Sequence, residues 1–290
     1  DLGMPPPGDI RHCMEALANA EPVMQQLLTY RFPEGSGNLT GQSFGNLILA
    51  ALNGVTGSFE EAVAQMSQVL AITGQVIPVT SADVQLEAVF ENGTQVVGES
   101  KICDFKKQQD CRIHHVNLIP AKPEPLPSAL EAIRDADLIL LGPGSLYTSV
   151  IPNLLVEGVP QAIAETDALK IYICNIMTQD GETEGYTAAD HVQALMEHGA
   201  PGMVDLCLAN CAPVPENLLG RYEEEGAVPL VVDRERIAAM GLELVERPVA
   251  REKGDFARHD PDKLAEAVLD IYRQRAMRIF RGKNRYIIEE

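Results

Sequence analysis

One glycine-rich segment holds the residues best suited to bind an anion. It runs from Leu141 to Ser149, reads Leu-Gly-Pro-Gly-Ser-Leu-Tyr-Thr-Ser, and directly follows the run Asp137–Leu141. Glycines allow a backbone to approach a ligand closely, and the N–H groups at the start of a following helix attract phosphate. A tight strand-to-helix turn with a serine cap explains the same residues equally well. Local spacing does not separate the two interpretations.

Two further segments place polar residues or prolines after predicted strands. Asn175, Thr178 and Gln179 lie at the end of the predicted strand 170–176 and could bind a base, a ribose or a sugar. Without further support, an ordinary turn at Asp180-Gly181 is the simpler interpretation. Residues 209–215 contain two prolines and predict a rigid loop. Ligands of open parallel sheets bind beyond the carboxyl ends of the strands, where these three segments should lie.

Two segments near the N-terminus open predicted helices. Asp9 follows a proline run and is well placed as a helix N-cap, and Arg11 beside it could reach a phosphate. Residues 40–46 contain two glycines, which favour close approach or capping. Neither segment matches a Walker A or dinucleotide-binding motif. No Ser-His-Asp or Cys-His arrangement follows from the spacing, so we expect no catalytic residue.

Apolar periodicity alternates between helix-like and strand-like segments along most of the chain. Helices are predicted over 10–30 with an interruption at Pro22, over 42–53, 59–73 and 126–135, within 147–164, and over 188–198, 216–225 and 261–279. Strands are predicted over 75–80, 84–90, 94–99, 113–119, 137–141, 170–176, 203–209 and 228–232. This alternation predicts a mostly parallel sheet covered on both faces, with an Asn92-Gly93 hairpin at an edge. No linker is visible, so we expect a single α/β domain over residues 1–290.

The charge balance excludes broad binding of polyanions. The chain has 23 basic and 42 acidic residues and a net charge of -19, which repels nucleic acid and anionic lipid. No apolar run reaches the roughly 20 residues that span a bilayer, and no secretory signal is visible. The basic cluster near the C-terminus is interpreted as a solvated helix end, with a partner or RNA surface as the alternative. It consists of Arg273, Arg275, Arg278, Arg281, Lys283 and Arg285.

The six cysteines are scattered, which indicates reduced thiols and a cytoplasmic protein. Cys207 and Cys211 have no second Cys/His pair at zinc-like spacing, and the six histidines show no metal-like pattern. We therefore expect no metal site.

Several motifs in a fixed order are more specific than any one of them. They are Gly8-Asp9-Ile10-Arg11, Gly45-Asn46-Leu47, the segment from Leu141 to Ser149 with Pro152-Asn153-Leu154-Leu155, and Asn175-Ile176-Met177-Thr178-Gln179. This order resembles the YvcK branch of the YvcK/CofD-like family, the gluconeogenesis factors. The resemblance covers nearly the whole chain, including residues 222–227, 258–260 and 263–265. The Gly-Pro-Gly-Ser-Leu-Tyr-Thr-Ser match is highly specific.

The resemblance implies a Rossmann-like three-layer α/β/α fold, a cytoplasmic location, and binding of a UDP-sugar such as UDP-GlcNAc or UDP-glucose, with no cofactor required. Members of this branch regulate cell shape and cell-wall synthesis during growth on gluconeogenic carbon. We therefore expect a non-enzymatic regulator with a protein partner in cell-wall regulation; a homodimer stays open. The alternative is the CofD-branch activity, a 2-phospho-L-lactate transferase that uses a nucleotide-diphosphate donor and a deazaflavin.

Tyr222 and Arg258 are the site residues that the resemblance implies most sharply. A tyrosine ring can stack on uracil or bond to ribose, and an arginine can engage a diphosphate with two hydrogen bonds. The structural alternatives are that Tyr222 packs its own helix and that Arg258 pairs with Asp260 or Asp262. A second set is expected to line the pocket: Asp9, Asn46, Gly144 and Ser145.

Family members usually begin with a strand, a Gly-rich nucleotide loop and an Asp-Asp-Gly-Gly-Ser segment before the equivalent of residues 2–5. The sequence starts after these elements. We therefore expect the first strand and a principal phosphate loop to be missing from it, and full ligand affinity to depend on them.

Overall fold

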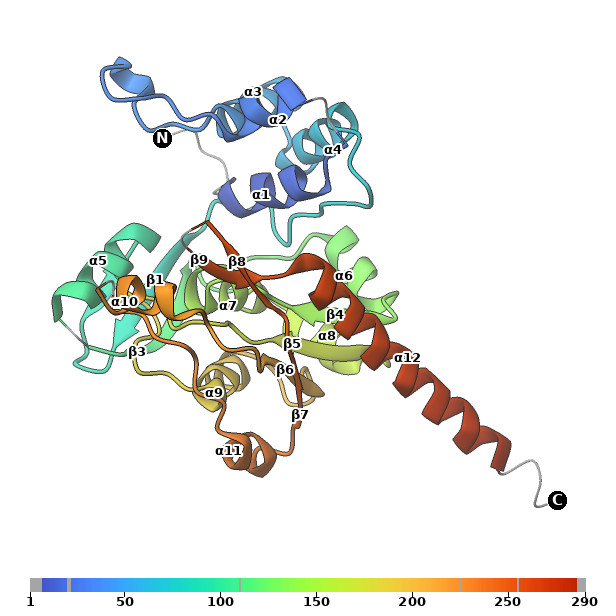
Figure 1. The fold of residues 1–290 in the computed structure, drawn as a ribbon. Helices are drawn as coiled ribbons and strands as arrows, with labels where there is room; N and C mark the ends of the chain where they lie inside the picture. The colour runs from blue at the N-terminus through green and yellow to red at the C-terminus, as the bar shows by residue number, and fades with distance from the viewer. Residues whose placement is uncertain (1–6, 20–21, 110, 225, 255, 286–290) are drawn as a thin grey trace.

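A four-stranded parallel sheet forms the centre of the protein. The computed structural model describes residues 7–19, 22–109, 111–224, 226–254 and 256–285 (Figure 1). The sheet has the order β4-β5-β6-β7, with strands Leu138–Leu141, Leu169–Ile173, Leu206–Asn210 and Glu243–Arg247. The two central strands, β5 and β6, are buried along almost their whole length. Such burial is expected of a parallel sheet with helices on both faces.

Alternate residues of the central strands pack on opposite faces of this sheet. Ile171 and Leu208 contact α12 (Pro261–Arg285) through a cluster that includes Val268. Tyr172 and Cys207 point the other way, into the larger cluster that holds α8 (Val159–Glu165), α9 (Ala188–His198) and α11 (Arg234–Ala239). The chain therefore has the predicted Rossmann-like three-layer α/β/α architecture.

The predicted hairpin is confirmed, but it does not lie at an edge of the parallel sheet and belongs to a second, antiparallel sheet. Its strands are β1 (Gln85–Phe90) and β2 (Gln95–Val97), and β1 also pairs with β3 (Ile113–Ile119), giving the order β2-β1-β3. Gly93 has a φ of +83°, and the Thr94 N–H donates to Asn92 Oδ1 at 3.0 Å. This turn chemistry is the reason that the dipeptide predicted the hairpin. The helix α5 (Glu99–Gln109) packs on β1 and β2.

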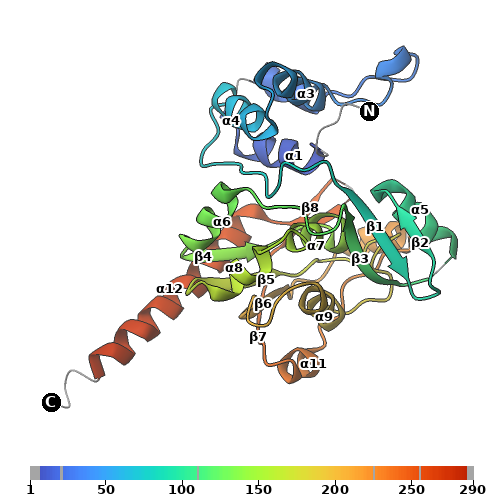
Figure 2. The same ribbon diagram turned by 180° about the vertical axis from the view of Figure 1, so that it is seen from behind.

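Helices near the N-terminus form a group with a hydrophobic cluster of their own, here called the helical lobe (residues 8–69). It comprises α1 (Gly8–Leu17), α2 (Pro22–Thr29), η1 (Gly37–Leu39), α3 (Phe44–Thr56) and α4 (Phe59–Val69). Its cluster is built from Met14, Leu28, Leu49, Phe59, Val63, Met66 and Leu70. Figures 1 and 2 both show these helices together on one side of the sheets. The single-domain assignment stays a prediction.

Two predicted strands are wrong. Within the described residues, 75–80 forms no ladder; Val76 packs on the helical lobe and Val79 on the main core, so the apolar side chains belong to an extended connection. Residues 228–232 make only isolated bridges, Met177 to Pro229 and Thr187 to Val231. Their apolar character reflects packing of Leu230 and Val232 rather than a strand.

The remaining elements complete the fold. The helix expected within 147–164 is divided into a π-helical turn η2 (Leu146–Val150), α7 (Ile151–Leu154) and α8. Gly158, with a φ of +78°, lies directly before α8 in the turn that separates it from α7. The others are α6 (Pro127–Arg134), α10 (Glu216–Glu224), β8 (Ala250–Lys253) and β9 (Phe256–His259). Within the described ranges, no helix combines the length and apolar character that a membrane crossing requires.

Candidate ligand-binding site

A pocket of about 790 Å³ lies at the carboxyl ends of β4 and β5 and is called the strand-end pocket. It is lined by Lys107, residues 143–145, Ser149, residues 175–180, Tyr222, Ala227 and residues 256–259. Four predicted site residues therefore meet at one cavity: Gly144, Ser145, Tyr222 and Arg258. The other two, Asp9 and Asn46, lie in the helical lobe and do not line it. Asn46 Oδ1 instead accepts a hydrogen bond from Arg11 Nε at 3.0 Å.

The first wall of the strand-end pocket is the turn that follows β4. Gly142 has a φ of +85°, and a Cβ there would lie 3.2 Å from the carbonyl oxygen of Ile173, so glycine fits both the conformation and the close approach. A cis peptide joins Gly142 to Pro143. Ser145 Oγ then donates to Gln179 Oε1 at 2.8 Å. The turn is thereby fixed to the neighbouring loop.

The second wall is the loop after β5, and hydrogen bonds hold it on both sides. Thr178 bonds to Val228 twice, through its N–H to the Val228 oxygen and through Oγ1 from the Val228 N–H. The Gln179 N–H donates to Thr183 Oγ1 at 2.9 Å. Asn175 is different, because its Oδ1 is buried and has no hydrogen-bond partner among the described residues. An unpaired buried acceptor in the wall of a pocket is a place for a ligand donor.

Three basic side chains, Arg258, Lys107 and His259, line the strand-end pocket. Arg258 lies on β9, with its guanidinium carbon 5.0 Å from the centre of the Phe256 ring. Within the part of the chain that the structure describes, Arg258 makes no ion pair, so the alternative pairing with an aspartate is not seen. Lys107 Nζ lies 2.7 Å from Asp180 Oδ2. Burial lowers the pKa of His259, whose Nε2 donates to the Cys174 oxygen at 3.2 Å.

Tyr222 reaches the pocket with its ring, while its hydroxyl is engaged elsewhere. The Ala257 N–H donates to the Tyr222 hydroxyl at 2.9 Å, and the hydroxyl lies 3.4 Å from the Ala257 oxygen. The ring also meets Phe256 edge to face, with centroids 6.4 Å apart. Tyr222 therefore anchors β9, and its ring is the part left to contact a ligand.

Glu182 is a buried carboxyl that the sequence did not single out. It is fully buried behind the turn, and neither carboxylate oxygen has a hydrogen-bond partner of ordinary geometry among the described residues. Burial raises its pKa to about 7, while the Thr148 hydroxyl and the N–H groups of residues 146–148 oppose that rise. An internal carboxylate thus faces the N–H groups at the start of η2. These N–H groups are less available to an external phosphate than the sequence suggested.

The third predicted strand end does not line the strand-end pocket. Asn210, at the end of β6, uses its Oδ1 to accept hydrogen bonds from the N–H groups of Ala212, Val249 and Ala250. These bonds fix the start of β8. Asn210 therefore has a structural role in positioning the hairpin that carries Arg258.

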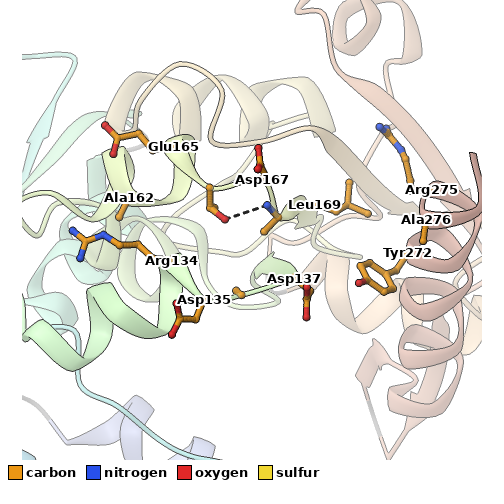
Figure 3. Close-up of a pocket in the computed structure, with 13 residues that line it drawn as sticks. Arg134, Asp135, Asp137, Ala162, Glu165, Asp167, Leu169, Tyr272, Arg275 and Ala276 are labelled. Atoms are coloured by element: carbon orange, nitrogen blue, oxygen red, sulfur yellow. Dashed lines mark hydrogen bonds between the residues drawn. The ribbon is translucent and has the colours of Figure 1, made fainter. Parts of the chain in front are cut away.

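A second groove lies at the opposite ends of the strands and has the wrong charge for a phosphate. It has a volume of about 660 Å³ and is bordered by four carboxylates, Asp135, Asp137, Glu165 and Asp167, together with Arg134 and Arg275 (Figure 3). The acidic side chains outnumber the basic ones and would repel a diphosphate. The strand-end pocket is therefore the better candidate for an anionic ligand.

The basic cluster on α12 is partly paired with acidic residues. Arg273 lies 3.7 Å from Asp270, and Arg275 pairs with Glu243. The structure describes α12 as far as Arg285 but does not describe its side chains from Arg278 onward. Among the residues that the structure describes, no group of three or more His, Cys, Asp or Glu side chains is arranged to hold a metal ion.

Comparison with known proteins places this chain in a family. The model of the family "2-phospho-L-lactate transferase CofD" matches residues 1–250. The "Gluconeogenesis factor" of Bacillus subtilis is 45% identical over 274 residues, which cover 94% of this chain and 85% of the relative. That of Halalkalibacterium halodurans is 44% identical over 270 residues, covering 93% and 82%.

A solved structure agrees with the sequence comparison. The crystal structure of a UPF0052 family member from Bacillus halodurans superposes with a TM-score of 0.87 at 43% identity, covering 93% of this chain and 85% of that one. The family model and these relatives span most of the chain. The chain therefore belongs to the CofD family, and within it to the gluconeogenesis factors.

Proposed function

We propose that the chain is a cytoplasmic, non-enzymatic regulator that binds a UDP-sugar in the strand-end pocket and passes that signal to a protein of cell-wall synthesis. The names of the relatives support the gluconeogenesis-factor role. The proposal adds the ligand and its place, and both rest on the chemistry of the pocket.

The observation that carries the proposal is the convergence of three kinds of group on one cavity. Arg258, without a carboxylate partner among the described residues, provides a cation for the diphosphate. Asn175 provides an unpaired acceptor that suits uracil N3–H or a sugar hydroxyl. The Tyr222 ring offers an aromatic surface for the base. A volume of about 790 Å³ falls within the range of small-molecule and cofactor sites.

The side chains of the pocket favour binding over chemistry. His259 Nε2 is engaged by a backbone carbonyl, Lys107 is paired with Asp180, and Ser145 donates to Gln179. Among the described residues, the hydrogen-bond partner of Ser145 Oγ is an amide oxygen and not a base. The pocket therefore lacks the nucleophile-base pair of a covalent catalyst among its described residues.

Calorimetric titration of the full-length protein with UDP-GlcNAc and UDP-glucose tests the proposal. We expect saturable binding, and a Kd raised about 10- to 100-fold by Arg258→Ala, because one charge-assisted contact contributes about 1.5–3 kcal/mol. Arg273→Ala removes an exposed arginine far from the pocket and should leave the Kd unchanged. Absence of binding to either sugar nucleotide would overturn the proposal.

The alternative function is the reaction that the family model is named for, 2-phospho-L-lactate transfer. Incubation with a nucleotide-diphosphate donor and a deazaflavin acceptor separates the two functions. The regulatory proposal predicts binding without product. Formation of a phospholactyl-deazaflavin would assign the protein to the transferases.

A further inference from the structure

A carboxylate of the protein lies in the strand-end pocket beside one of its cations. Asp180 is the one acidic residue among the described residues that line this cavity. Its Oδ2 lies 2.7 Å from Lys107 Nζ, and Lys107 lines the same cavity. An anion that enters the pocket therefore meets a lysine that already has a carboxylate partner.

The two permanently charged cations of the pocket come from separate elements. Lys107 belongs to α5, which packs on β1 and β2, whereas Arg258 belongs to β9. A UDP-sugar carries one negative charge on each of its two phosphates. An arginine and a lysine on separate elements can therefore each bind a different phosphate.

Close packing holds α5 against the loop that carries Asp180. A Cβ at Gly181 would lie 3.0 Å from Lys107 Cε and 3.1 Å from the Cys103 oxygen, so glycine allows the helix to approach the loop. The side chains of Lys107 and Asp180 nevertheless stay 49% and 33% exposed. The lysine stem is thus positioned at the pocket, while its ammonium group can exchange one partner for another.

The alternative role of the Lys107–Asp180 pair is to fasten α5 to the loop. Lys106, which is buried, already does this, since its Nζ lies 2.9 Å from Glu184 Oε2. Glu184 also accepts a hydrogen bond from the Gly181 N–H. Exposed ion pairs contribute little to stability because water screens them. The fold therefore does not need the Lys107–Asp180 pair as a fastener.

We propose that Lys107 is a second diphosphate-contacting residue of the strand-end pocket, which Asp180 holds in the absence of ligand and which passes from the carboxylate to a phosphate when ligand binds. The inference rests on the proposed function, because the diphosphate is that of the UDP-sugar. Asp180 then lowers the affinity for the ligand, since the diphosphate must displace it and afterwards lies near an unpaired carboxylate. The exchange favours ligands with two phosphates, because Arg258 alone can bind a single one.

The direction of two substitution effects separates this exchange from fastening. In calorimetric titration of the full-length protein with UDP-GlcNAc, Lys107→Ala should raise the Kd about 5- to 20-fold, because one charge-assisted contact is lost. Asp180→Asn should lower the Kd about 3- to 10-fold, because it releases Lys107 and removes a carboxylate from the pocket. Fastening predicts instead that both variants loosen the loop and weaken binding.

The ion pair of Arg273 and Asp270 on α12 is the matched control. Their side chains are 67% and 53% exposed, and neither residue lines the pocket. Asp270→Asn removes the same charge as Asp180→Asn, and Arg273→Ala removes a cation as Lys107→Ala does. Both control variants should keep the Kd of the wild type. Circular dichroism and chemical unfolding establish that each variant is folded.

Inorganic pyrophosphate, titrated in the same way, tests the exchange without the base and the sugar. We expect the same opposite shifts of its Kd in Lys107→Ala and Asp180→Asn. If pyrophosphate shows these shifts and UDP-GlcNAc does not bind, the exchange stands and the proposed function fails. If UDP-GlcNAc binds but the two variants shift its Kd in the same direction or not at all, the exchange is overturned and the proposed function stands. A wild-type protein that binds neither compound would overturn both.

Discussion

Ser145 and Gln179 join the two walls of the strand-end pocket through one side-chain hydrogen bond, from Ser145 Oγ to Gln179 Oε1 at 2.8 Å. The serine follows β4, and the glutamine follows β5, its neighbour in the parallel sheet. The bond therefore couples the glycine turn to the loop that carries Asn175. Pocket shape depends on this coupling, because both walls are irregular backbone outside the sheet.

Ser145→Ala should weaken ligand binding more than it weakens the fold. The variant loses one half-buried hydrogen bond, so we expect the free energy of unfolding to fall by about 0.5–1.5 kcal/mol. The turn also becomes free to move against the Gln179 loop, which should raise the Kd for a UDP-sugar about 3- to 10-fold. Chemical unfolding and calorimetric titration measure the two effects.

Ser128→Ala is the matched control. Ser128 Oγ donates to Glu60 Oε1 at 2.8 Å, between α6 and α4 and away from the pocket. It should lose similar stability and keep the Kd of the wild type. Equal losses of affinity in both variants would show that the Ser145–Gln179 bond does not act on the site.

Tyr222→Phe should lower stability while binding is retained. The substitution removes the hydroxyl that accepts from the Ala257 N–H and leaves this buried donor unpaired, which costs about 1–3 kcal/mol. The ring remains, so the Kd for a UDP-sugar should change less than about threefold. Tyr222→Ala, which removes the ring as well, should lower both the stability of the protein and its affinity for the UDP-sugar. A stable Tyr222→Phe protein that no longer binds would mean that the hydroxyl contacts the ligand instead.

Glu182→Gln should make the protein more stable above neutral pH. Burial raises the pKa of Glu182 from 4.5 to about 7, so between these values the folded state holds a proton that the unfolded state has released. The free energy of unfolding contributed by this group therefore falls as pH rises from about 4.5 to about 7, by roughly 3 kcal/mol in total. Glutamine has no such titration, and its advantage over glutamate should be largest at about pH 8 and vanish below about pH 4.

Unfolding curves over this pH range check the sign. Glu157 lies on the surface, and Glu157→Gln provides a control that should follow the wild type at every pH. A Glu182→Gln protein that is less stable than the wild type at high pH would indicate that the carboxylate is needed to hold η2. Burial would then not be the dominant influence on the pKa of Glu182.

Gly142→Ala should cost more stability than Gly158→Ala. Both glycines have positive φ, +85° and +78°, so both substitutions carry the strain of a left-handed conformation, about 1–2 kcal/mol. A Cβ at 142 would also lie 3.2 Å from the Ile173 oxygen, whereas nothing lies within 4 Å at 158. We expect an extra loss of about 1 kcal/mol at 142, measured by chemical unfolding. Equal losses would mean that the turn moves aside at no cost.

The parts of the fold with strong local signals were predictable from the sequence. The continuous apolar strands β4, β5 and β6, the hairpin and α9 were confirmed with small shifts at their ends. The elements that were missed are rich in charge. β7 reads Glu-Leu-Val-Glu-Arg and β8 reads Ala-Arg-Glu-Lys, so neither shows the apolar run of a buried parallel strand. Edge position and pairing, rather than composition, make them strands.

Part of the site was predictable for a similar reason. Gly144, Ser145, Tyr222 and Arg258 lie in motifs and meet at the strand-end pocket. Lys107 and Glu182 were missed because their surroundings come from distant segments. Lys107 reaches the pocket from α5, a helix that was not predicted because its sequence is mostly polar. Glu182 is fully buried although it follows an Asp-Gly turn, and sequence periodicity carries no sign of that burial. Asp9 and Asn46 were predicted because they belong to the same motifs, but they do not line the cavity.

The central claim is that the strand-end pocket holds a UDP-sugar, and a crystal structure of the full-length protein with bound UDP-GlcNAc tests it most directly. The account predicts density in this pocket, with the Arg258 guanidinium within hydrogen-bond distance of a diphosphate oxygen and a donor of the ligand on Asn175 Oδ1. A ligand seated in the acidic groove between α12 and the start of β5, or a pocket that stays empty at saturating ligand, would contradict it.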